Sequence, residues 1–411
     1  MRKGQLEPSL LVLTTLGLVA FGLVMVYSAT SAPAALGGGD PVHYLKRQSA
    51  YALLGLALMV VVSRTSFRGL RSLSAILVPA ALVLLLAVLV VGDPVNGARR
   101  WIAFGPFVFQ PSELAKLALC VWAAAYLARR RPPQTLRELS RPFGLLAAVF
   151  FVLLLAEPDL GTSVTIAVML AGLLVVAGTP VRVLGAGFGI AAAVGLAAIA
   201  LEPYRRERLF SFLDPWSDAE GAGFQTVQAM IGMGSGGIFG VGLGESVLKL
   251  FYLPEAHTDM IFAIVGEELG LVGTAAVVGA FAAFGYAGFR VALACGDPFG
   301  KLLAAGLTTL ICGQALINLA AVLGLAPLTG IPLPFVSAGG SSLVIALTSV
   351  GILLNIAGDD AGTARARVPD RRRGDGRPRA AGARRGGSAR RTRSTRDVRR
   401  VAGSRRGAAR S

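Results

Sequence analysis

The chain has 411 residues, of which 54% are hydrophobic and only 15% charged, and its mean hydropathy is +0.65. A soluble protein of this size needs more charge on its surface, so the composition excludes a soluble globular fold. The formal net charge of +17 comes mostly from the stretch after Ala357, which holds 18 Arg and 5 Asp.

Long apolar segments separated by short charged loops predict an all-α polytopic membrane protein. The first segment is longer than the apolar part of a signal peptide, so we expect it to be a membrane helix as well. We predict ten membrane helices, at about 9–27, 48–63, 74–92, 112–127, 143–156, 160–178, 182–201, 260–289, 302–323 and 340–357.

The distribution of basic residues predicts the orientation. Alternate loops hold most of the short-range arginines and lysines, and such loops usually face the cytoplasm. Both termini are therefore expected in the cytoplasm, and the large loop at about 202–258 is expected outside it.

The Arg-rich stretch 358–411 has a composition of Arg, Gly, Ala and Ser that cannot bury a core. We predict a disordered cytoplasmic tail after a membrane domain at 1–357. Topology and solubility explain such a tail, and attraction to anionic membrane lipids is the alternative. No aromatic residue interleaves the arginines, so nucleic-acid binding is not expected.

Polar residues collect in the loops predicted outside. In 97–116, Glu113 and Lys116 are spaced to pair on a helix that starts near Pro111. The glycine-rich run 232–244 permits close approach either to phosphate or to another helix, and the sequence leaves both open. The proline- and glycine-rich loop 324–342 predicts irregular backbone that lines a cavity.

The stretch 253–270 places Glu255, His257, Thr258 and Asp259 immediately before an apolar run that contains Glu267 and Glu268. Carboxylates in or beside hydrocarbon are costly and are often functional. For Asp259 we favour function. For Glu267 and Glu268, a functional role and structural pairing with a basic residue are equally acceptable.

Six motifs appear in an order that resembles the SEDS family, named for shape, elongation, division and sporulation. The resemblance covers about Ser9–Ala357 and is closer to division than to elongation members. Its motifs are GARRWI with FQPSELAK, EPDLGT, DPW with GFQ, GSGGIFGVGLG, YLPEAHTDMIFAIVGEELG and PLTGIPLPFVSAGGSSL. Met260 and Ala338 depart from the family's usual Phe and Tyr, and neither departure removes a charged or catalytic group.

The resemblance implies a peptidoglycan glycosyltransferase that polymerises lipid II during cell division. A hydroxyl nucleophile needs a base, and Asp259 is the best-placed candidate. A diphosphate leaving group needs positive charge from Arg, Lys or a divalent cation such as Mg²⁺ or Mn²⁺. No organic cofactor is expected. The candidate substrate-binding residues are Arg100, Glu113, Lys116, Lys249, His257 and Ser341.

The resemblance also implies partners: a class B penicillin-binding transpeptidase of the septum and other division proteins of the bacterial cytoplasmic membrane. Two rival functions remain, an elongation polymerase and a lipid II flippase. A flippase needs charged residues near the membrane midplane, whereas here the polar motifs lie at helix ends. A scaffold that only recruits the transpeptidase leaves Asp259, Glu113 and Lys116 unexplained.

Removing the tail from about Ala364 should leave membrane insertion and polymerase activity intact, because the tail lies outside every motif. The measurement is glycan synthesis in detergent by the truncated protein. Loss of insertion or of activity would make the tail part of the working fold.

Overall fold

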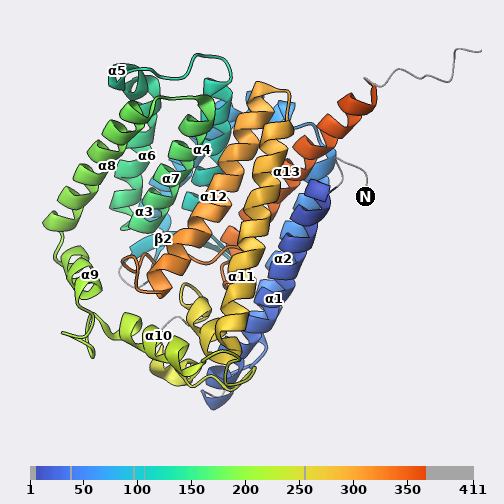
Figure 1. Ribbon diagram of the computed structural model, residues 1–411. Helices are drawn as coiled ribbons and strands as arrows, with labels where there is room; N and C mark the ends of the chain where they lie inside the picture. Colours follow the sequence, from blue (N-terminus) through green and yellow to red (C-terminus); the bar gives the residue numbers. More distant parts are fainter. Residues whose placement is uncertain (1–5, 38, 96–97, 106, 254–255, 367–411) are drawn as a thin grey trace, which may run out of the picture. The chain divides into compact units, whose positions relative to one another are not determined.

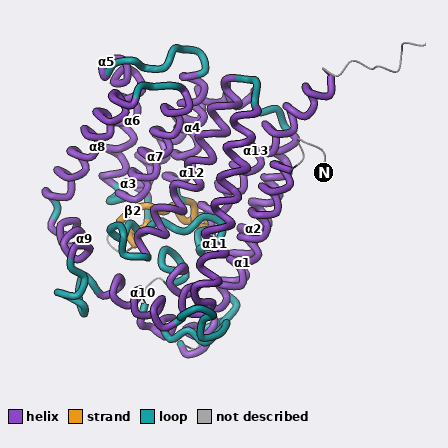
Figure 2. Tube along the Cα trace, viewed as in Figure 1, coloured by secondary structure: helices purple, strands orange, loops and turns teal. Residues whose placement is uncertain are grey.

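The computed structural model describes residues 6–37, 39–95, 98–105, 107–253 and 256–366. Glu255 and the Arg-rich tail beyond Ala366 lie outside this part of the chain. The described residues form a bundle of long helices, with a small sheet in one of the connecting loops (Figures 1 and 2).

All ten predicted membrane segments are helical. Within the described residues, nine helical stretches are long and apolar enough to span a membrane, and one of them is Leu136–Ala156, whose last part is α6. The tenth segment, α4, has 17 residues, the lower limit for a span. The long helices are α1 (Leu6–Leu36), α2 (His43–Arg64), α3 (Arg68–Val91), α4 (Pro111–Leu127), α6 (Leu145–Ala156), α7 (Leu160–Ala177), α8 (Val181–Leu201), α11 (Ile261–Ala294), α12 (Pro298–Val322) and α13 (Gly340–Ala366).

Helix α12 packs against α4, α7, α11 and α13, and most of its residues are buried (Figure 1). Small residues make this possible. A Cβ on Gly306 would lie 2.7 Å from Sγ of Cys120 on α4, and a Cβ on Gly313 would lie 2.9 Å from the side chain of Val168 on α7. Lipid is as apolar as the helix surfaces, so close packing of this kind, rather than hydrophobic burial, favours helix association.

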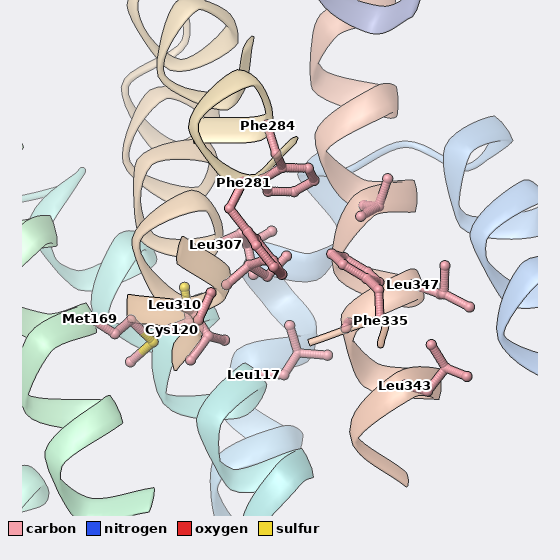
Figure 3. Close-up of a cluster of buried hydrophobic side chains, with 14 of the residues drawn as sticks. Leu117, Cys120, Met169, Phe281, Phe284, Leu307, Leu310, Phe335, Leu343 and Leu347 are labelled. Carbon is pink, nitrogen blue, oxygen red and sulfur yellow. The ribbon is translucent and has the colours of Figure 1, made fainter. Parts of the chain in front are cut away.

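The large apolar side chains meet where α11, α12 and α13 converge on the loop before α13. Phe335 of this loop lies against Phe284 of α11, with ring centroids 5.8 Å apart. Leu117 and Cys120 of α4 belong to the same cluster (Figure 3). The loop has no regular secondary structure, as the sequence predicted, and its second half is buried in the bundle from Leu333 to Ser337.

Helix α11 is interrupted at Gly270, whose φ is +63°. The interruption frees backbone groups that hydrocarbon cannot satisfy. The glycine-rich loop supplies their partners through four hydrogen bonds: Val241 N to Glu267 O (3.0 Å), Gly242 N to Glu268 O (3.1 Å), Leu271 N to Gly237 O (2.9 Å) and Val272 N to Ile238 O (3.1 Å).

These contacts favour one of the two interpretations of the glycine-rich run. A Cβ on Gly236 would lie 2.0 Å from the Gly266 carbonyl oxygen, and a Cβ on Gly240 2.1 Å from that of Glu268. The glycines therefore let the loop lie directly on α11, so helix packing explains them.

Glu267 and Glu268 hold the same loop with their side chains. Glu267 accepts hydrogen bonds from the Ser246 hydroxyl and from the Val247 amide (3.0 Å). Glu268 is bound by the Ser28 hydroxyl at 2.7 Å and by Lys249 at 3.2 Å. Both carboxylates are buried. Glu268 has the basic partner that the structural alternative required, whereas Glu267 is held by a hydroxyl and backbone amides.

The two ends of the bundle differ in character. At one end, Arg290 pairs with Glu7 (3.4 Å) and Arg68 with Asp359 (2.6 Å), so the loops predicted to be cytoplasmic lie together. Helix α13 continues through this end to Ala366. The boundary expected at residue 358 therefore falls inside a helix, because no proline follows before Pro369.

The opposite end, which we call the site end, comprises the C-terminal ends of α3, α6 and α12 and the N-terminal ends of α4, α7, α11 and α13. Its loops carry structure that the sequence did not predict. A three-stranded antiparallel sheet pairs Ile102 with Phe109 and Ala103 with Val108. The elements are β1 (Asp93–Val95), β2 (Ala98–Phe104), β3 (Phe107–Phe109), α9 (Pro203–Leu213), α10 (Phe224–Ser235) and η2 (Leu248–Tyr252). Two further short elements, α5 (Leu136–Leu139) and η1 (Ser140–Gly144), lie at the other end of the bundle, where they lead into the N-terminal end of α6.

Gly240→Ala should destabilise the protein by about 2 kcal/mol or more, because φ is +81° and the new methyl group meets the Glu268 carbonyl. Gly234→Ala is the matched control, since a Cβ there meets nothing within 4 Å. Thermal unfolding in detergent measures both. Equal melting temperatures for the two variants would contradict the close packing of this loop.

Candidate active site

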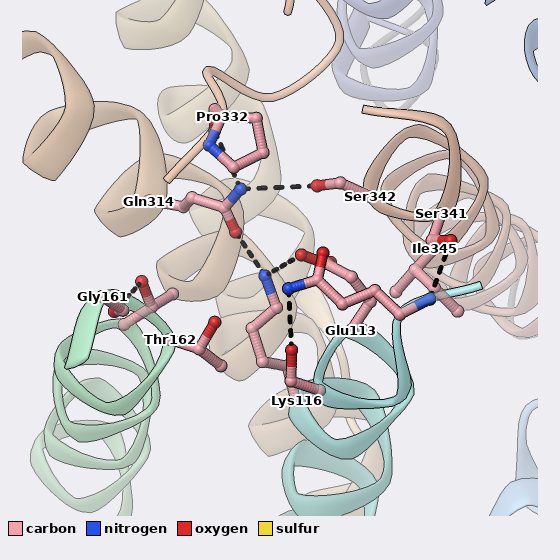
Figure 4. A network of polar contacts seen from close by, with 12 residues as sticks. Glu113, Lys116, Gly161, Thr162, Gln314, Pro332, Ser341, Ser342 and Ile345 are labelled. Atoms are coloured by element: carbon pink, nitrogen blue, oxygen red, sulfur yellow. Dashed lines mark hydrogen bonds and ion pairs between the residues drawn. The ribbon is translucent and has the colours of Figure 1, made fainter. Parts of the chain in front are cut away.

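A buried ion pair lies at the N-terminal end of α4. Lys116 Nζ donates to Glu113 Oε1 at 2.9 Å and to Gln314 Oε1 of α12 at 2.7 Å (Figure 4). The side chains of Lys116 and Glu113 are 2% and 4% exposed. The predicted pairing of Glu113 with Lys116 is confirmed, and the pair is part of a network that includes α12.

Two amides of α12 extend this network towards Asp259. Gln314 Nε2 donates to the Pro332 carbonyl at 3.0 Å. One helical turn further on, Asn318 Nδ2 donates to the Ile331 carbonyl at 2.8 Å and to the backbone carbonyl of Asp259 at 2.7 Å. The segment before α11 and the loop before α13 are therefore fixed to the same face of α12.

Asp259 lies just before Met260, the N-cap residue of α11. Its side chain is half-buried, and Oδ1 accepts a hydrogen bond from the Thr258 hydroxyl at 3.1 Å. Gly330 of the loop before α13 lies alongside, because a Cβ there would be 3.9 Å from Oδ2. The carboxylate therefore lies where two loops meet at the site end.

Arg100 of β2 is hydrogen-bonded to the turn between α6 and α7. Its Nε donates to the Glu157 carbonyl at 3.0 Å, and Nη2 donates to the Pro158 carbonyl. The Glu157 side chain is buried, and neither carboxyl oxygen has a hydrogen-bond partner. Burial, with a smaller contribution from the charge of Asp159, raises the pKa of Glu157 to about 8, and Arg100 partly opposes the rise.

A chain of hydrogen bonds joins this turn to the start of α13. Asp159 caps α7 by accepting from the Thr162 amide at 3.0 Å and also accepts from the Ser112 hydroxyl at 3.3 Å. Gln110 donates to Ser112 through its side chain at 3.0 Å and to the Ser341 hydroxyl through its backbone at 3.1 Å. Ser341 is therefore a fixed member of the site end.

The remaining two candidates differ in their placement. The His257 ring packs edge-on against Tyr44 of α2 at 4.6 Å, and its carbonyl accepts from the Ala338 amide at 2.9 Å, so it lies beside Asp259. Lys249 instead bonds Glu268 and the Gly244 carbonyl in the separate cluster below the glycine-rich loop. Among the described residues, Lys249 shares no polar contact with the residues around Asp259.

The structure brings in four residues that the sequence reasoning did not single out: Glu157, Asp159, Gln314 and Asn318. The two amides carry a readable signal, since they are polar residues four apart inside an apolar membrane segment. The two carboxylates belong to a motif that was noted without individual roles. Their meeting with Arg100 and Ser112 depends on tertiary packing.

The described residues offer few side chains that could bind a metal ion. They contain no group of three His, Cys, Asp or Glu side chains that could hold a metal ion. Mg²⁺ commonly uses only one or two carboxylates together with substrate phosphates. Asp259 with a diphosphate substrate would therefore fit such an ion.

The fold and the site together define a multi-pass helical membrane protein with a buried polar network and a half-buried carboxylate at one end of its bundle. A family model described as cell cycle protein, FtsW/RodA/SpoVE, matches residues 8–361. The chain belongs to the FtsW/RodA/SpoVE family.

Individual relatives support this assignment. The probable peptidoglycan glycosyltransferase FtsW of Geobacter metallireducens is 41% identical over 357 residues, covering 86% of this chain and 95% of that protein. That of Alcanivorax borkumensis is 42% identical over 363 residues, covering 86% and 94%.

Solved structures show the same fold. A chain in a peptidoglycan synthase complex matches with a TM-score of 0.71 at 34% identity, covering 85% of this chain and 97% of that one. The rod shape determining protein RodA of Thermus thermophilus matches with a TM-score of 0.62 at 33% identity, covering 85% and 96%.

Lys116→Ala should lower the stability by about 3–5 kcal/mol, because it leaves the Glu113 carboxylate buried without its partner. Activity should fall with it. Lys46→Ala is the control: it removes an exposed ion pair with Asp40, which solvent screens, so it should leave the stability nearly unchanged. Thermal unfolding measures the stability of both variants, and glycan synthesis measures their activity. Unchanged stability with lost activity would assign Lys116 to substrate binding alone.

Proposed function

We propose that the chain is a peptidoglycan glycosyltransferase that polymerises lipid II into β-1,4 glycan strands at the outer face of the cytoplasmic membrane. The observation that carries this proposal is the half-buried carboxylate of Asp259, fixed at the site end by Asn318. Family membership and relatives named as peptidoglycan glycosyltransferases support the same activity.

The reaction requires a base beside the acceptor sugar. The acceptor's 4-hydroxyl oxygen forms the new bond to C1 of the donor sugar as the bond from C1 to the diphosphate oxygen breaks. The hydroxyl proton passes to Asp259, and undecaprenyl diphosphate leaves with the bonding electrons. The half-buried position of Asp259 just before α11 suits the role of base.

Arg100 is the best-placed residue to supply positive charge that stabilises the leaving diphosphate. Two of its five N–H donors bind backbone carbonyls, and its side chain is partly exposed, so three donors remain for an anion. Lys116 is fully engaged with Glu113 and Gln314 and is almost completely buried, so we assign it to holding the site together. Ser341 and His257 line the same end.

A divalent cation is part of the proposal. Asp259 is the described residue that would share Mg²⁺ or Mn²⁺ with the diphosphate, and the ion would neutralise charge on the leaving group. The other residues act independently of it: Asn318 orients the Asp259 segment, and Arg100 stays within reach of the phosphates.

The placement of polar groups favours an enzyme over a flippase. The side chains around Asp259 belong to helix ends and loops at the site end. A flippase needs its charged groups near the middle of the membrane, reachable from both sides. Glu267 and Glu268, the carboxylates further along α11, are buried; Glu268 pairs with Lys249 of η2, and Glu267 accepts hydrogen bonds from the segment that follows the glycine-rich loop.

We further propose that the protein serves cell division at the septum, together with a class B penicillin-binding transpeptidase and other division proteins. The relatives named FtsW support division over elongation. The similarity to a chain of a peptidoglycan synthase complex supports a transpeptidase partner. Both termini would face the cytoplasm, with the site end outside.

Asp259→Asn should lower glycan polymerisation by about 10²–10⁴-fold, because the amide keeps the shape of the side chain and cannot accept the hydroxyl proton. The measurement is chain formation from labelled lipid II by the purified protein, with and without its transpeptidase, across a range of Mg²⁺ and Mn²⁺ concentrations.

Asp40→Asn, which changes an exposed carboxylate in the loop between α1 and α2, is the matched control and should retain wild-type turnover. Near wild-type turnover of Asp259→Asn would exclude Asp259 as the base. Recovery of its activity at high metal concentration would show that metal binding, and not proton transfer, is the main contribution of Asp259.

A further inference from the structure

Arg100 and Glu157 lie together without forming an ion pair. The guanidinium donates hydrogen bonds to the backbone carbonyls of Glu157 and Pro158, while the Glu157 carboxyl group is fully buried and accepts none from it. Both of its oxygens lack a hydrogen-bond partner. A buried acid beside an arginine normally takes the arginine as its partner, so this arrangement calls for a functional reason.

An unpaired carboxylate in this position would be costly if it were ionised. The group is at the C-terminal end of α6, where the helix dipole also disfavours a negative charge. Its pKa of about 8 agrees with a neutral acid at physiological pH. The charge of Arg100 is therefore not cancelled by its nearest acid.

The other charged groups on the neighbouring elements are already occupied or lie further out. Asp159 is bound by Thr162 and Ser112, and Glu113 pairs with Lys116. On β2, Arg99 donates to the carbonyls of Leu89 and Val90. On β1, Asp93 is exposed. Glu157 is thus the acid whose ionisation would change the charge felt by Arg100.

We propose that Glu157 is a positioning residue that acts as an uncharged acid: it places no charge beside the turn to which Arg100 is bound and so leaves the guanidinium free to bind a phosphate group of the lipid substrate. This rests on the proposed function. Ionised Glu157 would attract the guanidinium and compete with the phosphate. The site would therefore lose affinity for a lipid diphosphate as the pH rises through about 8.

The test is the KM and kcat for lipid II between about pH 7 and about pH 9, with wild type and two uncharged variants, Glu157→Gln and Glu157→Met. The wild-type KM should rise about tenfold over this range, with a much smaller change in kcat. Both variants should keep a nearly constant KM, because neither side chain can ionise. The second variant keeps the test valid where the first fails to fold.

The same comparison in an Arg100→Gln background isolates the mechanism. In this background the KM should be about tenfold higher than the wild-type KM at about pH 7, and it should be the same at about pH 9. Adding Glu157→Gln to Arg100→Gln should not change how the KM depends on pH. A wild-type KM that follows pH in the same way as the Glu157→Gln KM would overturn the proposal and leave Glu157 a purely structural acid. So would a Glu157 effect that persists without Arg100.

Binding of farnesyl diphosphate, a soluble polyprenyl diphosphate, separates this inference from the proposed function. Its affinity should fall above about pH 8 in wild type and not in Glu157→Gln. Polymerase activity at pH 7 with pH-independent binding would refute the inference alone. Absence of polymerase activity with pH-dependent binding would refute the function alone.

Stability supplies an independent check of the protonation state. A raised pKa in the folded protein means that folding takes up a proton between about pH 4.5 and about pH 8, so stability contributed at this site falls as the pH rises through that window. Glu157→Gln removes this dependence. Its melting temperature should therefore exceed that of wild type by more at about pH 8 than at about pH 5; an equal difference would show that Glu157 is ionised throughout.

Discussion

Two amide side chains of α12, Gln314 and Asn318, hold separate parts of the chain in register. Gln314 bonds Lys116 and the Pro332 carbonyl, and Asn318 bonds the carbonyls of Ile331 and Asp259. Inside an apolar bundle, every buried polar group needs a partner. This constraint places Asp259, the proposed base, at the same end of the protein as the buried ion pair and the loop before α13, and that placement makes a single reaction site possible.

The helices were predictable because hydrocarbon imposes one simple requirement, about 20 apolar residues in a row. All ten segments form helices, with errors mainly at their ends, as where α13 continues past residue 358. The sheet around Arg100 and the interruption of α11 at Gly270 were not predicted. Both depend on partners distant in sequence, since the bonds that complete α11 come from the glycine-rich loop.

The site was predictable in part for similar reasons. The pairing of Glu113 with Lys116 follows from their spacing on one helix, and it is present. Lys249 has the charge that a phosphate-binding residue needs, but it pairs with Glu268. Its partner could not be predicted, because the pairing depends on the tertiary fold. The role proposed for Glu157 could not have been predicted from the sequence. It depends on a carboxyl group that is buried without a hydrogen-bond partner, while Arg100 binds the backbone carbonyl of the same residue.

The most direct test of the account is a structure of the protein with a lipid II analogue bound as acceptor. The distance to measure is that between the acceptor's 4-hydroxyl oxygen and the nearer carboxylate oxygen of Asp259. The account predicts hydrogen-bond reach, about 2.6–3.2 Å, or a single bridging water. An acceptor bound at the site end with its hydroxyl beside another carboxylate, and Asp259 out of reach, would contradict it.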